Sequence, residues 1–112
     1  MSDRKINCPV AVTLSLIEGK WKVLILRDLL AGTKRFGELQ RSVEGISQKV
    51  LTTQLKSLEA NGIVKRIAYA EVPPRVEYQL TAEGHSLHTV IEAMNIWGED
   101  YKKRHGGEDC DH

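Results

Sequence analysis

The sequence predicts one mainly helical domain that carries a short β-hairpin. Three features lead to this prediction. Apolar residues recur with helical spacing over the first half of the chain, the spacing changes to two between residues 64 and 80, and helical spacing returns after residue 81. The chain has 112 residues, which suits a single domain and excludes a cofactor domain joined to a substrate domain.

The first half of the chain is predicted to form helices. Pro9 suits the first position of a helix because its ring fixes φ, and Gly19 ends that segment. Residues 20–31 carry two apolar stripes, which indicates a second helix buried on two sides. A short third helix is expected to begin at Lys34 and Arg35.

The segment that begins at Ser47 is the most informative. Ser47 is a good N-cap, because its hydroxyl accepts a hydrogen bond from an otherwise unpaired backbone N–H. Leu51, Leu55 and Leu58 form an apolar face, and Gly62 ends the helix. The opposite face forms hydrogen bonds and carries Gln48, Lys49, Thr52, Thr53 and Lys56.

Residues 64–80 are predicted to form a two-stranded hairpin with its tip at residues 72–75, because prolines belong at a tip or an edge. Thr81 is expected to cap a last helix. Its apolar stripe has the 3-4-3-4 spacing of a helix that packs against another helix, so we expect a homodimer built on this helix and the first one. The stripe consists of Leu87, Val90, Met94, Trp97 and Tyr101.

Charge is distributed unevenly along the chain. The formal net charge is +1, but residues 34–75 hold eight basic and four acidic residues, whereas residues 76–112 hold three and eight. A basic middle is expected where a protein meets an anionic partner. An uneven scatter of surface charges is the alternative explanation.

A helix-turn-helix followed by a hairpin is a winged helix, and its second helix is built to lie in the major groove of DNA. Gln48 can bond bidentately to adenine and Lys49 to guanine, while the methyl groups of Thr52 and Thr53 can pack on thymine. Arg75, at the predicted tip, is placed to enter the minor groove.

Other polar residues complete the predicted DNA-binding set. Lys34 and Arg35 are expected to hold phosphates rather than contact bases, and a plain surface charge is the alternative for Arg35. Ser47 and Lys56 belong to the set because they lie on the recognition helix or at its start. A two-fold dimer further implies an inverted-repeat operator, with half-sites about 10 base pairs apart or a multiple of that.

The same residues resemble the HxlR-type transcriptional regulators, bacterial relatives of the MarR winged-helix group. The resemblance extends over about residues 8–101, nearly the whole chain. It rests on the segments Cys8–Val10, Gly19–Lys22, Arg35–Leu39, Ile46–Thr52, Gln54–Leu55, Leu58–Glu59 and Pro73–Tyr78.

This resemblance implies a homodimeric DNA-binding regulator that has no enzymatic activity and no cofactor. In some relatives a cysteine equivalent to Cys8 senses electrophiles or oxidants. In part of the family a second cysteine pairs with it across the dimer, and Cys110 is the candidate for this second cysteine, on weaker grounds than Cys8 for the first. Residues 1–105 are then the single DNA-binding and dimerisation domain, and residues 106–112 a flexible acidic tail.

Cys8 also stands out without the resemblance. It precedes Pro9 and so lies at the N-terminus of the first helix, where unpaired N–H groups favour a reactive cysteine. A small buried residue is the alternative. We expect both cysteines to be reduced at rest in a cytoplasmic protein without a membrane partner. The longest apolar run, Val23–Leu26, is far shorter than the ~20 residues of a membrane-spanning helix, and no secretory signal is evident.

Other functions compete with DNA binding. An enzyme would need a nucleophile with its base or paired carboxylates, and no such group stands out. His85 and His88 lie at i, i+3 and offer part of a metal site, with His105, Cys110 and His112 further on. A small-molecule pocket beside the last helix, or a winged helix used for protein contact, are the remaining alternatives.

Overall fold

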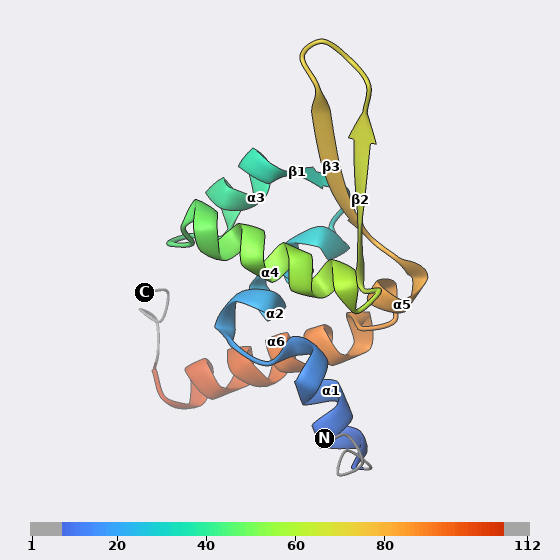
Figure 1. The fold of residues 1–112 in the computed structure, drawn as a ribbon. Helices are drawn as coiled ribbons and strands as arrows, with labels where there is room; N and C mark the ends of the chain where they lie inside the picture. Colours follow the sequence, from blue (N-terminus) through green and yellow to red (C-terminus); the bar gives the residue numbers. More distant parts are fainter. Residues whose placement is uncertain (1–7, 107–112) are drawn as a thin grey trace.

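The structure, a computed structural model that describes residues 8–106, contains six helices and three strands within that range. The helices α2, α3 and α4 gather in the middle, α1 and α6 lie at one end, and the hairpin β2–β3 extends away from the other (Figure 1). The elements are α1 Pro9–Ile17, α2 Lys20–Leu30, β1 Lys34–Arg35, α3 Phe36–Ser42, α4 Gln48–Ala60, β2 Val64–Tyr69, β3 Arg75–Leu80, α5 Ala82–His85 and α6 His88–Arg104.

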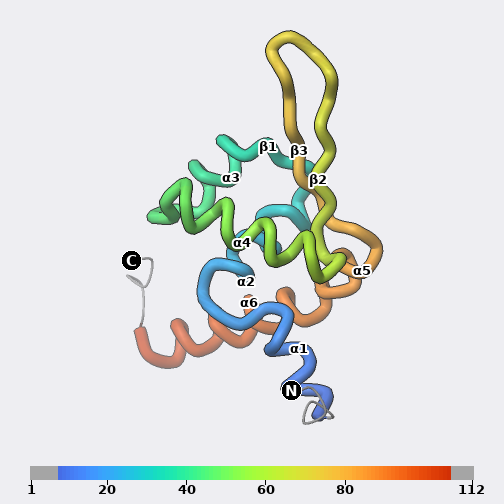
Figure 2. Tube along the Cα trace, viewed as in Figure 1, coloured from blue at the N-terminus to red at the C-terminus, as the bar shows by residue number. Residues whose placement is uncertain are grey.

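This arrangement confirms the predicted mainly α fold with a β-hairpin wing. The chain trace shows how the last helix returns beneath the helical layer, and α6 packs against α2 although the two are distant in sequence (Figure 2). None of the helices in residues 8–106 is long and apolar enough to cross a membrane.

A third strand was not predicted. Lys34 and Arg35 form β1, which leads directly into α3 with Arg35 as its N-cap, and β1 pairs antiparallel with β3, so that the sheet has the order β1-β3-β2. Lys34 lies opposite Tyr78, and Arg35 lies opposite Glu77. A two-residue strand has no periodicity of its own, because it is defined only by its pairing with a distant part of the chain.

The hairpin tip also differs from the prediction. β2 ends at Tyr69 and β3 begins at Arg75, and these two residues are paired in the antiparallel register. The tip therefore comprises residues 70–74, and Arg75 is a strand residue rather than part of the tip. Pro73 and Pro74 lie in the tip, as predicted.

The predicted last helix is divided into two. Thr81 caps only the short helix α5, its hydroxyl oxygen accepting a hydrogen bond from the N–H of Gly84 at 3.1 Å. The chain then turns, and Leu87 precedes the first residue of α6. Leu87 is 9% exposed and belongs to the core, so it does not extend the outer face of α6.

The core is apolar and holds α4 in place. Leu51, Leu55 and Leu58 are at most 1% exposed, and they share one cluster with Ile25 and Leu29 of α2. No polar or charged side chain is buried among the described residues. Because one face of α4 is fully buried in this cluster, its opposite face is directed to the surface.

We predict that Gly84→Ala lowers the free energy of unfolding by about 1–3 kcal/mol, the cost of overpacking a filled core. A Cβ atom at Gly84 would overlap the carbonyl oxygen of Ile63 and lie 3.1 Å from the side chain of Leu80. Urea denaturation measures the effect. The matched control is Gly37→Ala in α3, where the new Cβ lies 3.6 Å from Arg41 and the higher helix propensity of alanine adds about 1 kcal/mol of stability. Equal stability of the two variants would contradict this account of the packing.

Candidate nucleic-acid interface

The N-terminus of α4 is defined by Ser47. Its hydroxyl oxygen accepts a hydrogen bond from the N–H of Val50 at 3.1 Å, as predicted for an N-cap. Gly45, in the turn before α4, has a φ of +89°, a value that glycine adopts without steric cost. The residues Val43 and Ile46 on either side of it are buried. The turn between α3 and α4 is thus packed into the core, which sets the direction of α4.

The polar residues predicted on α4 gather on its outer face. Gln48, Lys49, Thr53 and Lys56 are exposed, and Thr52 is half-buried. The hydroxyl of Thr52 donates to the carbonyl oxygen of Gln48 at 2.9 Å, and that of Thr53 donates to the carbonyl oxygen of Lys49 at 3.0 Å. Since both hydroxyls donate their proton to the helix backbone, these threonines offer a partner their methyl groups and the lone pairs of the hydroxyl oxygen rather than a donor.

The cations before α3 lie on the edge strand of the sheet. Lys34 is half-buried and Arg35 is exposed. The backbone N–H of Arg35 donates to the Glu38 carboxylate at 2.7 Å, which anchors the start of α3. Among residues 8–106, no side chain forms a hydrogen bond or ion pair with the Arg35 guanidinium. This position leaves Arg35 able to hold an external anion.

Two cations of the wing were not predicted as site residues. Lys65 and Arg66 are both exposed on β2. Arg66 lies opposite Tyr78, which also faces Lys34, so Lys34 and Arg66 belong to one row across the sheet. The sequence signal was the pair of adjacent basic residues at the start of the first wing strand, but only the register shows which cations lie together.

Arg75 is held by three neighbours. Its Nη2 atom lies 2.8 Å from a carboxylate oxygen of Glu71, its Nη1 atom lies 2.8 Å from one of Glu77, and the guanidinium carbon lies 3.9 Å from the centre of the Tyr69 ring. The hydrogen bond that Arg75 donates to the Glu71 carboxylate is the main cause that raises the pKa of Arg75 above its ordinary value. We call Tyr69, Glu71, Arg75 and Glu77 the wing cluster.

The face of α6 away from the core is apolar. Of the residues predicted to form the dimer seam, Met94, Trp97 and Tyr101 are 47%, 63% and 47% exposed, and the rings of Trp97 and Tyr101 stack with centres 5.4 Å apart. Val90 is only half-buried and packs against the core, so it faces inward together with Leu87. An exposed apolar face of this kind marks a surface that binds another molecule.

The helix α1 carries exposed apolar residues as well. Val10, Val12 and Leu14 are 66%, 40% and 52% exposed, whereas Ile17 is buried. Ile96 of α6, which the sequence pattern did not single out, is 54% exposed. The spacing along α6 predicted one stripe without Ile96, whereas the exposed apolar surface of α6 includes this residue. The helices α1 and α6, which carry these exposed apolar residues, lie at the end of the molecule opposite the wing (Figure 1).

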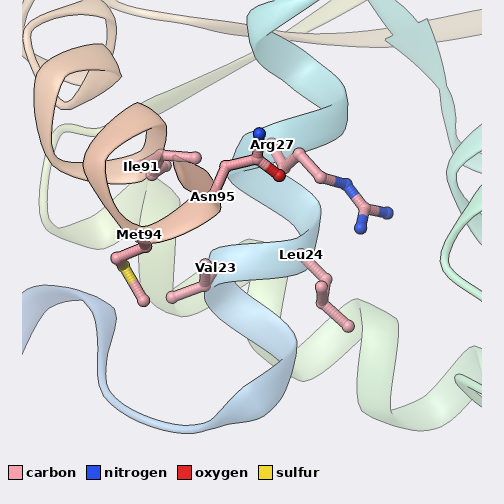
Figure 3. A pocket seen from close by; sticks show the side chains of 6 residues that line it. All are labelled: Val23, Leu24, Arg27, Ile91, Met94 and Asn95. Carbon is pink, nitrogen blue, oxygen red and sulfur yellow. The ribbon is translucent and has the colours of Figure 1, made fainter. Parts of the chain in front are cut away.

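A small cavity of about 180 Å³ lies between α2 and α6. Its walls are mostly apolar and include Val23, Leu24, Ile91 and Met94. Arg27 and Asn95 complete the lining, and Figure 3 shows the guanidinium of Arg27 directed away from Met94. The cavity is comparable in volume to one of about 150 Å³ that accepts benzene.

The predicted partial metal site is not assembled in the part of the chain that the structure describes. No group of three metal-binding side chains occurs among residues 8–106. His85 ends α5 whereas His88 begins α6, and Nε2 of His88 lies 3.0 Å from the Glu92 carboxylate. Cys110 and His112 lie outside the described residues.

Cys8 is an exposed free thiol at the N-cap of α1. The helix has no side-chain cap, and the carbonyl oxygen of Cys8 accepts a hydrogen bond from Val12 at 3.0 Å. The sulfur at this end of the helix is therefore exposed to solvent. The alternative of a buried cysteine is wrong.

Comparison with known proteins places this geometry in a family. The model of the family described as HxlR-like helix-turn-helix matches residues 16–106. YdeP, an uncharacterised HTH-type transcriptional regulator of Bacillus subtilis, is 48% identical over 103 residues, which span 92% of this chain and 80% of YdeP.

Two solved structures share the fold. The redox regulator HypR in its oxidised form superimposes with a TM-score of 0.79 at 47% identity, covering 83% of this chain and 96% of that one. The diamide-treated YodB from B. subtilis has a TM-score of 0.71 at 38% identity, covering 86% and 96%. The expected absence of enzymatic activity agrees with these relatives, which are regulators. This chain belongs to the HxlR-like helix-turn-helix family of DNA-binding transcriptional regulators.

Proposed function

We propose that this protein is a cytoplasmic, homodimeric repressor that binds an inverted-repeat operator through α4 and the wing. The observation that carries the proposal is the exposed polar face at the start of α4, which the buried leucines hold outward. Residues 1–105 act as the single DNA-binding and dimerisation unit.

Two kinds of contact are assigned within this interface. Gln48 and Lys49, in the first turn of α4, contact base edges in the major groove, with Thr52 and Thr53 on thymine methyl groups. Phosphates are held by cations of two elements, because exposed basic residues lie on α4 itself and on β1. The phosphate-binding residues are Lys34, Arg35, Ser47 and Lys56. Arg75 supplies the contact from the wing.

We predict that Gln48→Ala or Lys49→Ala weakens operator binding by about 1–3 kcal/mol and relaxes the preference at particular base pairs. Arg35→Ala should instead weaken binding to all sequences and lower the salt dependence of the binding constant by about one unit. Gel shifts against genomic fragments, followed by titrations at several salt concentrations, measure both effects. A changed base preference in Arg35→Ala, with none in the α4 variants, would contradict this docking.

Dimerisation is assigned to the exposed faces of α6 and α1. Met94, Trp97 and Tyr101 form the central contacts, and the inward-facing Val90 and Leu87 support them from the core. A two-fold axis through this surface would repeat the recognition helix at one helical turn of DNA or a multiple of it. A single winged helix makes too few contacts for high specificity.

We predict a dimer in sedimentation at micromolar concentration and, for Trp97→Glu, a dimer at least about 30-fold weaker, because a buried tryptophan is worth about 2 kcal/mol or more at an interface. Val72→Glu is the matched control, since Val72 is 98% exposed in the wing tip and outside the seam. This control should remain a dimer. A monomeric wild type, or a Trp97→Glu variant that dimerises as the wild type does, would remove the proposed seam.

Release of DNA is assigned to modification of Cys8. The support is its exposed sulfur at the uncapped end of α1, on the same helix as one apolar face of the proposed seam. HypR is described as a redox regulator, and YodB was crystallised after diamide treatment. Oxidation or alkylation of Cys8 would shift α1 against α6 and alter the distance between the two recognition helices. Cys110 of the partner is the candidate resolving thiol.

We predict that diamide or a quinone abolishes DNA binding by the wild type and leaves binding by Cys8→Ser intact. Gel shifts before and after treatment test this, with Cys110→Ser as the second variant. Loss of binding in Cys110→Ser as in the wild type assigns the sensor to Cys8 alone, whereas protection in both variants indicates a pair. Wild-type binding that survives both reagents would end the proposal.

The cavity between α2 and α6 favours a second candidate trigger, a small apolar molecule. α2 packs against both α6 and α4, so an occupant of this cavity would displace the dimer helix relative to the recognition helix. Insensitivity to diamide and quinones would favour this candidate over Cys8.

A further inference from the structure

The wing cluster contains more negative than positive charge. One guanidinium, that of Arg75, is bound by the two carboxylates of Glu71 and Glu77, each at 2.8 Å. Beside DNA this arrangement is unfavourable, because a carboxylate near a phosphate repels it, and an arginine that is already paired attracts the duplex weakly. The wing cation assigned to the minor groove is therefore compensated within the protein before DNA arrives.

The two carboxylates are not equivalent. Glu77 lies in the sheet, its side chain is 19% exposed, and it lies opposite Arg35 in the register of β1 and β3. Glu71 lies in the hairpin tip, and its side chain is 47% exposed. If Arg75 turned toward DNA, water would solvate the carboxylate of Glu71 more readily than that of Glu77, because the side chain of Glu71 is more exposed. Glu71 is thus the partner that Arg75 can exchange.

Tyr69 restricts how Arg75 can move. The guanidinium carbon lies 3.9 Å from the centre of the Tyr69 ring, and the two residues are paired across β2 and β3. Stacking on an aromatic face leaves the edge of a guanidinium free to change its hydrogen-bond partners. Arg75 can therefore exchange one acceptor for another without leaving its place on the wing.

We propose that Glu71 competes with duplex DNA for Arg75, and that this competition makes Glu71 a specificity-determining residue. This inference rests on the proposed function, in which Arg75 contacts DNA. Exposed ion pairs are weak, so a strong anionic site displaces Glu71 at little cost. A narrow minor groove offers such a site, whereas a duplex of arbitrary sequence offers a weaker one. Glu71 thereby reduces binding to arbitrary DNA more than binding to the operator.

The experiment compares the wild type with Glu71→Gln on a duplex of arbitrary sequence and on the genomic fragment that the wild type binds most tightly. We expect Glu71→Gln to bind the arbitrary duplex about two- to fivefold more tightly, the range of one exposed ion pair. The salt dependence should increase by about one unit, because one more cation is free to neutralise a phosphate. The gain on the genomic fragment should be smaller, so the ratio of the two affinities falls.

Two controls isolate Arg75 as the cause. Glu83→Gln removes the same charge from α5, at the opposite end of β3 from the tip, and should leave the affinity unchanged (Figure 1). In the double variant Glu71→Gln with Arg75→Gln, the gain should vanish relative to Arg75→Gln alone. Glu71→Ala provides a second removal of the carboxylate, and circular dichroism checks that each variant is folded.

The proposal is overturned if Glu71→Gln and Glu71→Ala bind the arbitrary duplex as the wild type does, if the gain persists without Arg75, or if Glu83→Gln shows the same gain. These outcomes are distinct from failure of the proposed function. That function fails when the wild type selects no genomic fragment, or when changes at Gln48 and Lys49 leave base preference unaltered. The affinity for an arbitrary duplex reports on Glu71 in either case.

Discussion

Burial of the apolar face of α4 against α2 is the constraint on which the rest of this molecule depends. Leu51, Leu55 and Leu58 are each at most 1% exposed, and full burial of one such side chain contributes about 1.5–3 kcal/mol. A rotation of α4 about its axis would expose these leucines and bury Lys49 without a partner, which costs far more than any surface contact returns. The polar face of α4 is directed outward because the apolar face must stay buried in the core.

The same cluster connects the helix to the wing and to α6. Val64 and Leu80, at the base of the hairpin, belong to it, and so does Ile91 of α6. Close-packed interiors are not continuously deformable. In the proposed complex, α4 and the wing therefore approach DNA as one body, and a change at the α1–α6 end reaches them as a displacement of the whole lobe rather than as a local distortion.

Local patterns predicted most of the fold, and non-local contacts account for what they missed. Helical periodicity was enough for α2 and α4, because a helix buries a repeating stripe of its own residues. β1 was missed, since Lys34 and Arg35 become a strand only through pairing with Tyr78 and Glu77, more than forty positions away. The division between α5 and α6 was missed because Leu87, which separates them, fits the helical spacing of the predicted stripe although its side chain is buried in the core.

The candidate site shows the same division between local and non-local information. The exposed side chains of α4 follow from the position of its buried leucines, so sequence reasoning found them. The surroundings of Arg75 depend on the hairpin register, which brings Tyr69 and Glu77 beside it and places Glu71 in the tip.

The basic residues of α4 and of the wing therefore differ in how far nearby carboxylates neutralise them. On α4, Lys49 is exposed and no ion pair forms with it among the described residues, whereas Arg75 of the wing is paired twice. In the proposed complex, Lys49 binds DNA without first losing an ion pair, whereas Arg75 adds to the affinity only where the groove attracts it more strongly than the Glu71 carboxylate does. In the proposed complex, selectivity therefore comes from the wing as much as from the helix that lies in the major groove.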